Sequence, residues 1–197
     1  MKNKLFILCG PRAIGGTYLI EKIVGEYPRV FREISSTTTR PPRPNNPNDA
    51  RHYRFLTKNG FIARHENGEF LEYDFHQNDY YGTRVSDLEN VLCASHGIMK
   101  MTPKGACTIA NSVGLHFQSF VIFLEPQNDD ILVRNMNRRF GTAKTKEQYK
   151  NELLRAYDFL FEMKRLLVPD YTIAMTGTSQ DVKFLKAFMR GESIALD

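Results

Sequence analysis

A glycine-rich turn near the start of the chain has the residue types and spacing of a phosphate-binding loop. Gly10, Gly15 and Thr17 fit the pattern G-x-x-x-x-G-K-[ST], whereas Gly16 stands where that pattern has lysine. Glycines let backbone N–H groups surround an anion at a helix N-terminus, and the lysine supplies the charge that follows a transferred phosphoryl group. The turn therefore predicts a phosphate cradle without its main cation, although a plain strand-to-helix turn would explain the same glycines.

Spaced arginines are a second feature that indicates phosphate binding. The chain has 27 Lys and Arg against 22 Asp and Glu, a net charge of +5, and its pI is about 9.1. This balance favours an anionic partner and leaves nucleic acid, nucleotide and phosphoprotein open. Spaced arginines, unlike a lysine-rich tail, suit discrete phosphates. They occur in three groups: Arg40 with Arg43, Arg51 with Arg54, and Arg134 with Arg138 and Arg139.

The elements around the turn indicate an α/β fold. Residues 4–9 form a short apolar run typical of a buried strand, and apolar residues recur at helical spacing from Thr17 until Pro28 ends the helix. Further strands and helices alternate in the C-terminal half, which implies a mainly parallel sheet with helices on both faces. The later strands are expected at 98–101, 119–124 and 171–175, and the later helices at 129–140, 146–166 and 180–189.

The middle of the chain has a different character. Residues 40–49 are rich in Pro and Asn, which excludes a helix or a central strand there. Short strands around turns are expected between residues 53 and 83, followed by a helix with apolar residues at helical spacing. The chain is therefore expected to divide into a core at 1–35 and 97–197, with a lid around 138–150, and an inserted subdomain at 36–96.

Four segments of the middle region resemble the guanylate kinase family. They are 35–44 (SSTTTRPPRP), 51–55 (RHYRF), 68–73 (GEFLEY) and 78–83 (NDYYGT). Their order and spacing match the family through its whole GMP-binding subdomain, and the core elements are similar to the same family over nearly the full chain. The resemblance implies a P-loop-type fold: a mainly parallel sheet with helices on both faces, and an inserted small mixed α+β subdomain that binds GMP.

By position, the resemblance implies a GMP site in the inserted subdomain. Two arginines would offer forked donors to the monophosphate, and two tyrosine hydroxyls would complete its shell. Glu72 would accept hydrogen bonds from the guanine N1 and N2 hydrogens, which adenine lacks, so the pocket would select guanine. A solvated Arg-Pro loop beside a strand with an outward glutamate is the structural alternative. The implied contacts are Ser36, Arg40, Arg43, Tyr53, Glu72, Tyr81 and Thr83.

The ATP side departs from the family pattern in three places. Gly16 replaces the loop lysine. The family's acidic pair falls on Lys100 and Thr102, and a family arginine falls on Glu152. A carboxylate that would support magnesium has thus become a cation. Because losing one preorganised charge donor typically lowers a rate by about 10²–10³, ordinary kinase turnover is not expected.

Two functions follow from this combination. The leading prediction is a non-catalytic module with a degenerate P-loop that binds GMP or a phosphorylated protein segment, and no cofactor is assigned to it. The alternative is an active guanylate kinase that uses ATP and magnesium, with Lys100 or Arg12 in place of the missing lysine. Arg134 and Arg138 match family arginines that reach the nucleotide phosphates, and with Lys100 they would be the catalytic residues. A nucleic-acid-binding domain has only net charge in its favour.

Other patterns exclude several classes of site. The five histidines have no ligand-like spacing, and the three cysteines have no paired or CxxC arrangement, so neither a metal site nor a disulfide is predicted. The longest early apolar stretch, residues 5–9, is too short for a signal peptide or a membrane span. We therefore expect a cytoplasmic protein without membrane insertion, and the sequence leaves its oligomeric state open.

Overall fold

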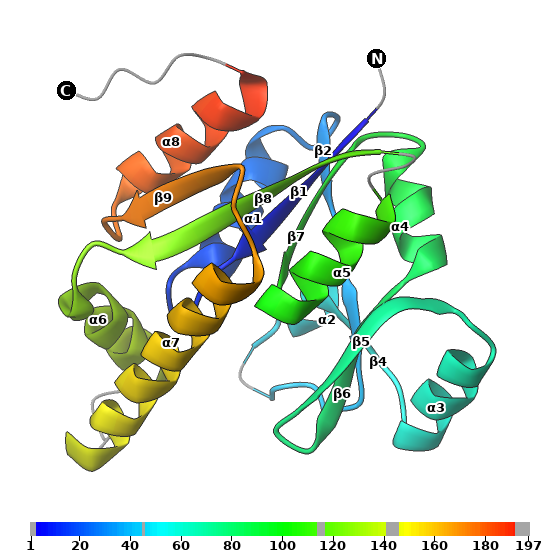
Figure 1. Cartoon of the computed structure of the whole chain (residues 1–197), viewed down its shortest axis with the longest axis horizontal. Helices are drawn as coiled ribbons and strands as arrows, with labels where there is room; N and C mark the ends of the chain where they lie inside the picture. The colour runs from blue at the N-terminus through cyan, green and yellow to red at the C-terminus, as the bar shows by residue number, and fades with distance from the viewer. Residues whose placement is uncertain (1–2, 45, 114–116, 141–145, 192–197) are drawn as a thin grey trace.

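Two sheets organise the chain, which the computed structural model describes at residues 3–44, 46–113, 117–140 and 146–191 (Figure 1). The larger sheet has five parallel strands in the order β2-β7-β1-β8-β9, and the smaller sheet has four strands of mixed direction in the order β4-β3-β6-β5. The expected α/β fold with a mixed subdomain is therefore confirmed. The strands are β1 (Lys4–Cys9), β2 (Phe31–Glu33), β7 (His96–Met101), β8 (Gln118–Pro126) and β9 (Tyr171–Met175) in the larger sheet, and β3 (Ser36–Thr38), β4 (Tyr53–Phe55), β5 (Phe70–His76) and β6 (Asp79–Arg84) in the smaller.

Helices cover both faces of the larger sheet (Figure 1). They are α1 (Gly16–Glu26) and α8 (Ser179–Arg190) on one face, and α4 (Val85–Leu92), α5 (Pro103–Val113) and the C-terminal half of α7 (Lys146–Leu166) on the other. Leu5 and Ile7 of β1 pack with α4 and α5, whereas Phe6 and Leu8 pack with α1 and α8. All four side chains are at most 1% exposed. Burial of each stabilises the fold by about 1.5–3 kcal/mol, which explains the uninterrupted apolar run.

The smaller sheet has an aromatic core of its own. Phe61 of α3 (Lys58–Glu66) stacks on Phe70 and Tyr80, with ring centroids 4.2 and 5.2 Å apart. A Cβ at Gly82 of β6 would lie 2.9 Å from a backbone oxygen of β5 and 2.9 Å from the Phe70 ring. The close approach of these two strands therefore requires glycine.

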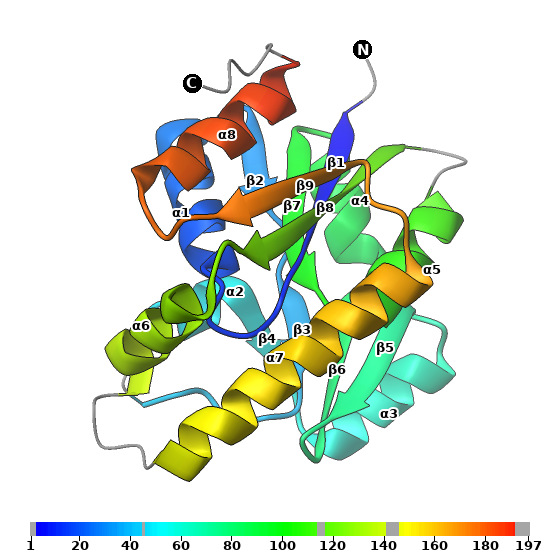
Figure 2. The same cartoon turned by 60° about the vertical axis from the view of Figure 1, so that its left-hand side comes forward.

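The carboxyl ends of the larger sheet's strands face α6 (Asp129–Phe140), the N-terminal half of α7 and the smaller sheet (Figure 2). The turn after β1, the end of β7 and the loop after β9 all lie at this edge, where α/β folds bind their ligands. The lid expected around 138–150 falls here as well, and its residues 141–145 lie outside the described residues. Within the described ranges, no helix is both long and apolar enough to cross a membrane.

Several elements begin and end where the sequence predicts. β1, α6, α7 and β9 have the predicted bounds. The Pro- and Asn-rich segment 40–49 is neither helix nor strand at its described positions before Asp49, where the short helix α2 (Asp49–His52) begins. The sequence analysis did not predict β2, β3, α3 and α5.

His52 links the smaller sheet's region to the core. Its side chain is 8% exposed, its Nδ1 lies 2.7 Å from Glu33 Oε1 of β2, and its Nε2 lies 3.1 Å from Glu21 Oε1 of α1. The hydrogen bond with Glu33 is the main influence that raises the pKa of His52, against the opposing effect of burial. A protonated His52 can donate to both carboxylates at once, and so holds α2 against α1 and β2.

We expect His52→Gln to destabilise the protein more at pH 6 than at pH 9. Because the pKa of His52 in the folded chain lies above its unfolded value of about 6.5, its contribution is complete below that pH and is lost as the pH rises through the folded-state pKa. Urea unfolding should give a loss of about 1.5–3 kcal/mol at pH 6 that shrinks by pH 9. The exposed His76→Gln is the control. Equal losses from His52→Gln at both pH values would contradict a charged bridge.

Candidate functional site

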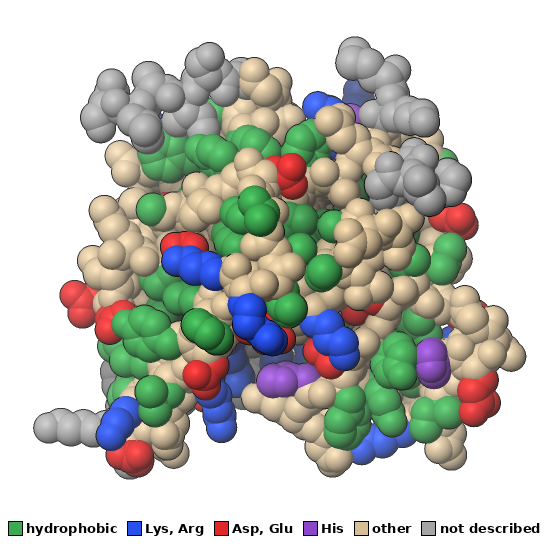
Figure 3. Space-filling model, viewed as in Figure 1, with side chains coloured by type: hydrophobic (Ala, Val, Ile, Leu, Met, Phe, Trp, Pro, Cys, Tyr) green, Lys and Arg blue, Asp and Glu red, His purple; other side chains and the backbone are tan. Residues whose placement is uncertain are grey.

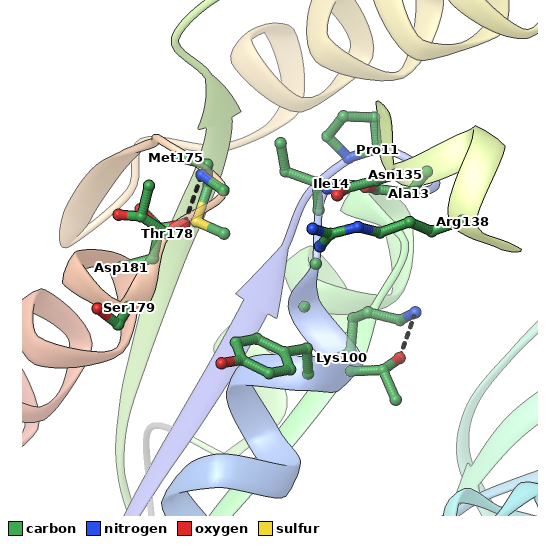
Figure 4. Close-up of a pocket in the computed structure, with 15 residues that line it drawn as sticks. Pro11, Ala13, Ile14, Lys100, Asn135, Arg138, Met175, Thr178, Ser179 and Asp181 are labelled. Atoms are coloured by element: carbon green, nitrogen blue, oxygen red, sulfur yellow. Dashed lines mark hydrogen bonds between the residues drawn. The ribbon is translucent and has the colours of Figure 1, made fainter. Parts of the chain in front are cut away.

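A cavity of about 430 Å³ opens at the carboxyl edge of the larger sheet (Figure 4). It is bounded by the glycine-rich turn, by Lys100 of β7, by Asn135 and Arg138 of α6, and by the loop between β9 and α8. Pockets for small ligands usually have volumes of about 300–1,000 Å³. The turn that the sequence predicts to bind phosphate therefore lines a cavity of suitable size for a nucleotide.

The geometry of the turn requires two of its glycines. A Cβ at Gly10 would lie 2.8 Å from Leu124 Cβ, and Gly15 has a φ of 105°, in the left-handed region. Gly15 is also the N-cap of α1 and has no side chain with which to bond the N–H groups of the first turn. These N–H groups and the positive end of the helix are thus left for an anion.

Lys100 occupies the space above Gly16. A Cβ at Gly16 would lie 3.0 Å from Lys100 Cδ and 3.6 Å from Lys100 Cγ. Lys100 Nζ lies 3.4 Å from Thr17 Oγ1 and donates to it (Figure 4). Arg12, the other predicted replacement for the lysine, instead has its Nη1 4.0 Å from Glu152 Oε2 of α7. An ammonium group therefore reaches the turn from strand β7 instead of from helix α1.

The two arginines predicted to reach the nucleotide phosphates have different surroundings. Arg138 lines the cavity, and its guanidinium points toward the glycine-rich turn (Figure 4). Arg134 lies against the loop after β9, where its Nη2 donates to the Thr176 carbonyl oxygen at 3.2 Å. The Arg138 side chain therefore lies at the cavity, whereas Arg134 is bonded to the loop that forms part of the cavity wall.

The acidic side chain of the cavity lining is already engaged. Asp181 is 2% exposed and accepts three hydrogen bonds of 2.8 Å, from the N–H and hydroxyl of Thr176 and from the N–H of Gly177. These bonds fix the loop between β9 and α8 and satisfy the carboxylate. Among the described residues that line the cavity, no other is acidic. The cavity is therefore cationic beside the turn.

A second polar group lies where β5, β6 and α5 meet. Thr83 Oγ1 donates to Glu72 Oε1 at 2.7 Å, and burial raises the pKa of Glu72 despite this bond. A Cβ at Gly105 of α5 would lie 3.0 Å from Glu72 Oε2 and 3.4 Å from Thr102 Oγ1. One oxygen of Glu72 thus accepts from the Thr83 hydroxyl, and its second oxygen lies near Gly105 and can accept further hydrogen bonds.

The two arginines of the Pro-rich segment are tied to Asp49. Arg40 is 8% exposed, its Nη1 and Nη2 each lie 2.7 Å from Asp49 oxygens, and its guanidinium stacks 4.4 Å from the Tyr53 ring centre. The hydrogen bonds from Arg40 are the main cause that lowers the pKa of Asp49 to about 2. The Arg43 N–H donates to Asp49 at 2.8 Å, but its guanidinium is 3.7 Å away on a side chain that is 39% exposed. Arg40 is therefore a buried, neutralised cation, and Arg43 is the accessible one.

The remaining residues predicted to contact GMP lie on the smaller sheet beside this ion pair. The rings of Tyr53 and Tyr81 are near-perpendicular, with centroids 6.4 Å apart. Ser36 is the register partner of Tyr53 between β3 and β4. The structure thus brings the predicted residues into two groups at the smaller sheet and the segment after β3, one around Arg40 and one around Glu72.

A family model described as guanylate kinase matches residues 2–179. The chain belongs to the guanylate kinase family. It is 34% identical over 172 residues to the guanylate kinase of Mycoplasmopsis synoviae (strain 53), which covers 81% of this chain and 85% of that protein. It is 28% identical over 197 residues to the guanylate kinase of Thermotoga maritima, which covers 98% of this chain and 88% of that protein. The crystal structure of guanylate kinase from Anaplasma phagocytophilum has the same fold, with a TM-score of 0.67 at 19% identity over 98% of this chain and 88% of that one.

Some relatives carry other descriptions. The chain is 25% identical over 162 residues to protein lin-2 of Caenorhabditis elegans, a match that covers 82% of this chain but 16% of that protein. Membership of the guanylate kinase family therefore does not by itself establish catalytic activity, which has to be argued from the residues of the two sites.

Three side chains that shape this guanylate kinase fold around its sites were not predicted from the sequence: Asp49, Asn135 and Asp181. Asn135 Nδ2 donates to the Ala13 carbonyl oxygen at 2.8 Å and so ties α6 to the turn. Asn135 bonds to the backbone of a segment 122 residues away, for which the sequence carries no signal, whereas Asp181 bonds to Thr176 and Gly177 close to it in the chain. Asp49 could have been suspected, because it lies in the same segment as Arg40 and has the opposite charge.

We expect Asp49→Asn to destabilise the protein by about 1–3 kcal/mol at pH 7, because it leaves the buried Arg40 guanidinium without its anion. Since the folded-state pKa of Asp49 is lowered to about 2, its contribution is present above the unfolded value near pH 4 and is lost as the pH falls toward 2. Urea unfolding at pH 7 measures the loss, with the exposed Asp158→Asn as the control. A loss no larger than that of the control would contradict the buried ion pair.

Proposed function

We propose that this chain transfers the γ-phosphoryl group of ATP to GMP, with Lys100 acting in place of the lysine that Gly16 lacks. The position of the Lys100 side chain supports this most. Its methylene carbons lie next to Gly16, and its ammonium group lies 3.4 Å from Thr17 Oγ1. Two relatives that match most of this chain are described as guanylate kinases. The sequence analysis favoured a non-catalytic module because the ATP side departs from the family pattern in three places, and the position of Lys100 answers the first of them, the lysine missing at Gly16.

The chemistry of this transfer suits the groups around the cavity. An oxygen of the GMP phosphate attacks the γ-phosphorus of ATP, the bond to the β–γ bridging oxygen breaks, and ADP leaves. Little covalent chemistry falls to the protein, so positioning and charge stabilisation carry most of the catalysis. The N–H groups at the start of α1 would hold the β-phosphate, while Lys100 and Arg138 would neutralise the charge of the moving group.

The acceptor side offers the matching set of donors and acceptors. Glu72 has an oxygen free of Thr83 that can accept from the N1 and N2 hydrogens of guanine. Arg43 is the exposed fork for the monophosphate, because Arg40 already holds Asp49. Tyr53 would add its hydroxyl to this shell, as would Tyr81, while Arg40 would keep the Tyr53 ring in place through stacking. GMP is therefore the acceptor that these residues favour.

The other functions gain less support. A module that binds GMP or a phosphorylated segment would use the same acceptor residues, but it gives no reason for Lys100 and Arg138 to line the cavity. On the face seen in Figure 3, Lys and Arg side chains lie beside Asp and Glu side chains instead of forming one basic surface. This face therefore adds nothing to the net charge in favour of nucleic-acid binding.

A coupled assay of ADP formation with GMP, ATP and magnesium tests the proposal. We expect GMP-dependent turnover at about 1–100 per second, the usual range for kinases. Lys100→Ala should lower this rate by about 10²–10³, as expected for the loss of one preorganised charge donor. Lys183→Ala, in an exposed lysine of α8, is the control and should leave the rate unchanged. Absence of GMP-dependent turnover in the unaltered protein would support the binding module instead.

Guanine selection is tested separately by calorimetric titration of GMP and AMP. We expect GMP to bind at least about tenfold more tightly, because adenine leaves the half-buried Glu72 carboxylate without its donors. Glu72→Gln should remove most of this preference, whereas the exposed Glu66→Gln should keep it. Equal affinity for GMP and AMP in the unaltered protein would remove the guanine site.

A further inference from the structure

The position of Lys100 also affects magnesium binding, because its ammonium group lies where enzymes with this turn bind Mg²⁺. The Ser or Thr hydroxyl of such a turn is a ligand of Mg²⁺, and a carboxylate commonly supports the ion. Here the equivalent hydroxyl, Thr17 Oγ1, accepts from the Lys100 ammonium at 3.4 Å. A cation that is already at this oxygen repels a second one.

Among the described residues that line the cavity, no free carboxylate compensates for this. Mg²⁺ needs an octahedral set of oxygen ligands, with carboxylates foremost among those that proteins supply. Asp181 is the acidic residue among the described lining residues, and its carboxylate accepts three hydrogen bonds from the loop before α8. The described part of the chain contains no group of three or more His, Cys, Asp or Glu side chains placed to hold a metal ion. The residues present therefore do not fit a protein-held magnesium ion.

The same residues do fit a polyphosphate that carries no metal. Lys100 and Arg138 place two cations in the cavity wall, and the N-terminus of α1 adds its free N–H groups. These groups supply positive charge where a metal ion would otherwise neutralise the phosphates. Lys100 thus combines two changes in one side chain, because it brings a cation to Gly16 and removes a metal ligand from the end of β7.

We infer that the donor site binds a nucleoside triphosphate without a divalent cation held by the protein. The inference rests on the proposed function in one respect, the identification of this cavity as the donor site. It concerns binding, so it is tested without measuring phosphoryl transfer.

The experiment is a calorimetric titration of the β,γ-imido analogue of ATP into the full chain, once with EDTA and once with excess magnesium. For the unaltered protein we expect dissociation constants that agree within about threefold, or tighter binding in EDTA. Lys100→Asp should weaken binding in EDTA by about tenfold or more, because it exchanges a cation for an anion at the phosphates. Lys183→Asp makes the same charge change on an exposed face of α8 and should bind like the unaltered protein.

The paired variant Gly16→Lys with Lys100→Asp should bind the analogue more tightly with magnesium than with EDTA. Its new lysine has room because the long stem over Gly16 is gone, and the carboxylate again provides a metal ligand. Circular dichroism identifies any variant that fails to fold, and the titrations of the unaltered protein decide the matter even then.

Binding to the unaltered protein that is more than threefold tighter with magnesium would overturn the inference, as would the absence of binding in EDTA. Binding of equal strength in both buffers, together with no phosphorylation of GMP, would support the inference and contradict the proposed function. GMP phosphorylation together with magnesium-dependent binding of the analogue would support the proposed function and contradict the inference.

Discussion

The stem of Lys100 and the backbone of Gly16 share one small volume, and the donor cavity depends on this contact. A Cβ at residue 16 would lie 3.0 Å from Lys100 Cδ, so a side chain at residue 16 would require the Lys100 side chain to shift. Because residue 16 is glycine, the Lys100 side chain of β7 can place its ammonium group beside Thr17 Oγ1. The start of α1 also stays accessible to an anion. Neutralisation of the phosphate charge and binding of a metal ion usually depend on different residues. Here both depend on Lys100, which supplies a cation and stands where a carboxylate would support the metal.

Charge pairing also orders the acceptor side. The Pro- and Asn-rich segment and α2 bury little apolar surface, so hydrophobic packing contributes little to holding them in place. Three ion pairs do this instead: Arg40 with Asp49 inside the segment, and His52 with both Glu21 and Glu33 of the core. Arg40 and the Tyr53 ring are thereby fixed before any ligand arrives, while Arg43 remains accessible.

The sequence predicted those features that depend on local pattern. The apolar run of β1 and the periodic helices α6 and α7 gave correct bounds, because burial on both faces and helical spacing leave clear signals. Helix α5 was missed because Pro103, Gly105 and a polar start conceal its periodicity, and α3 was missed because it buries a single phenylalanine, Phe61. The engagement of Arg40 by Asp49 and the reach of Lys100 to Thr17 are contacts in space that spacing alone cannot fix. The sequence therefore named Lys100 only as one of two possible cations.

A crystal structure of the chain with ADP and GMP tests the relocation of the lysine most directly. We predict that Lys100 Nζ lies about 2.7–3.2 Å from an oxygen of the β-phosphate, with its stem over Gly16. The GMP base should lie against Glu72, and its phosphate against the Arg43 guanidinium. A Lys100 side chain turned away from the nucleotide, with the β-phosphate held by backbone N–H groups and arginines alone, would contradict the account.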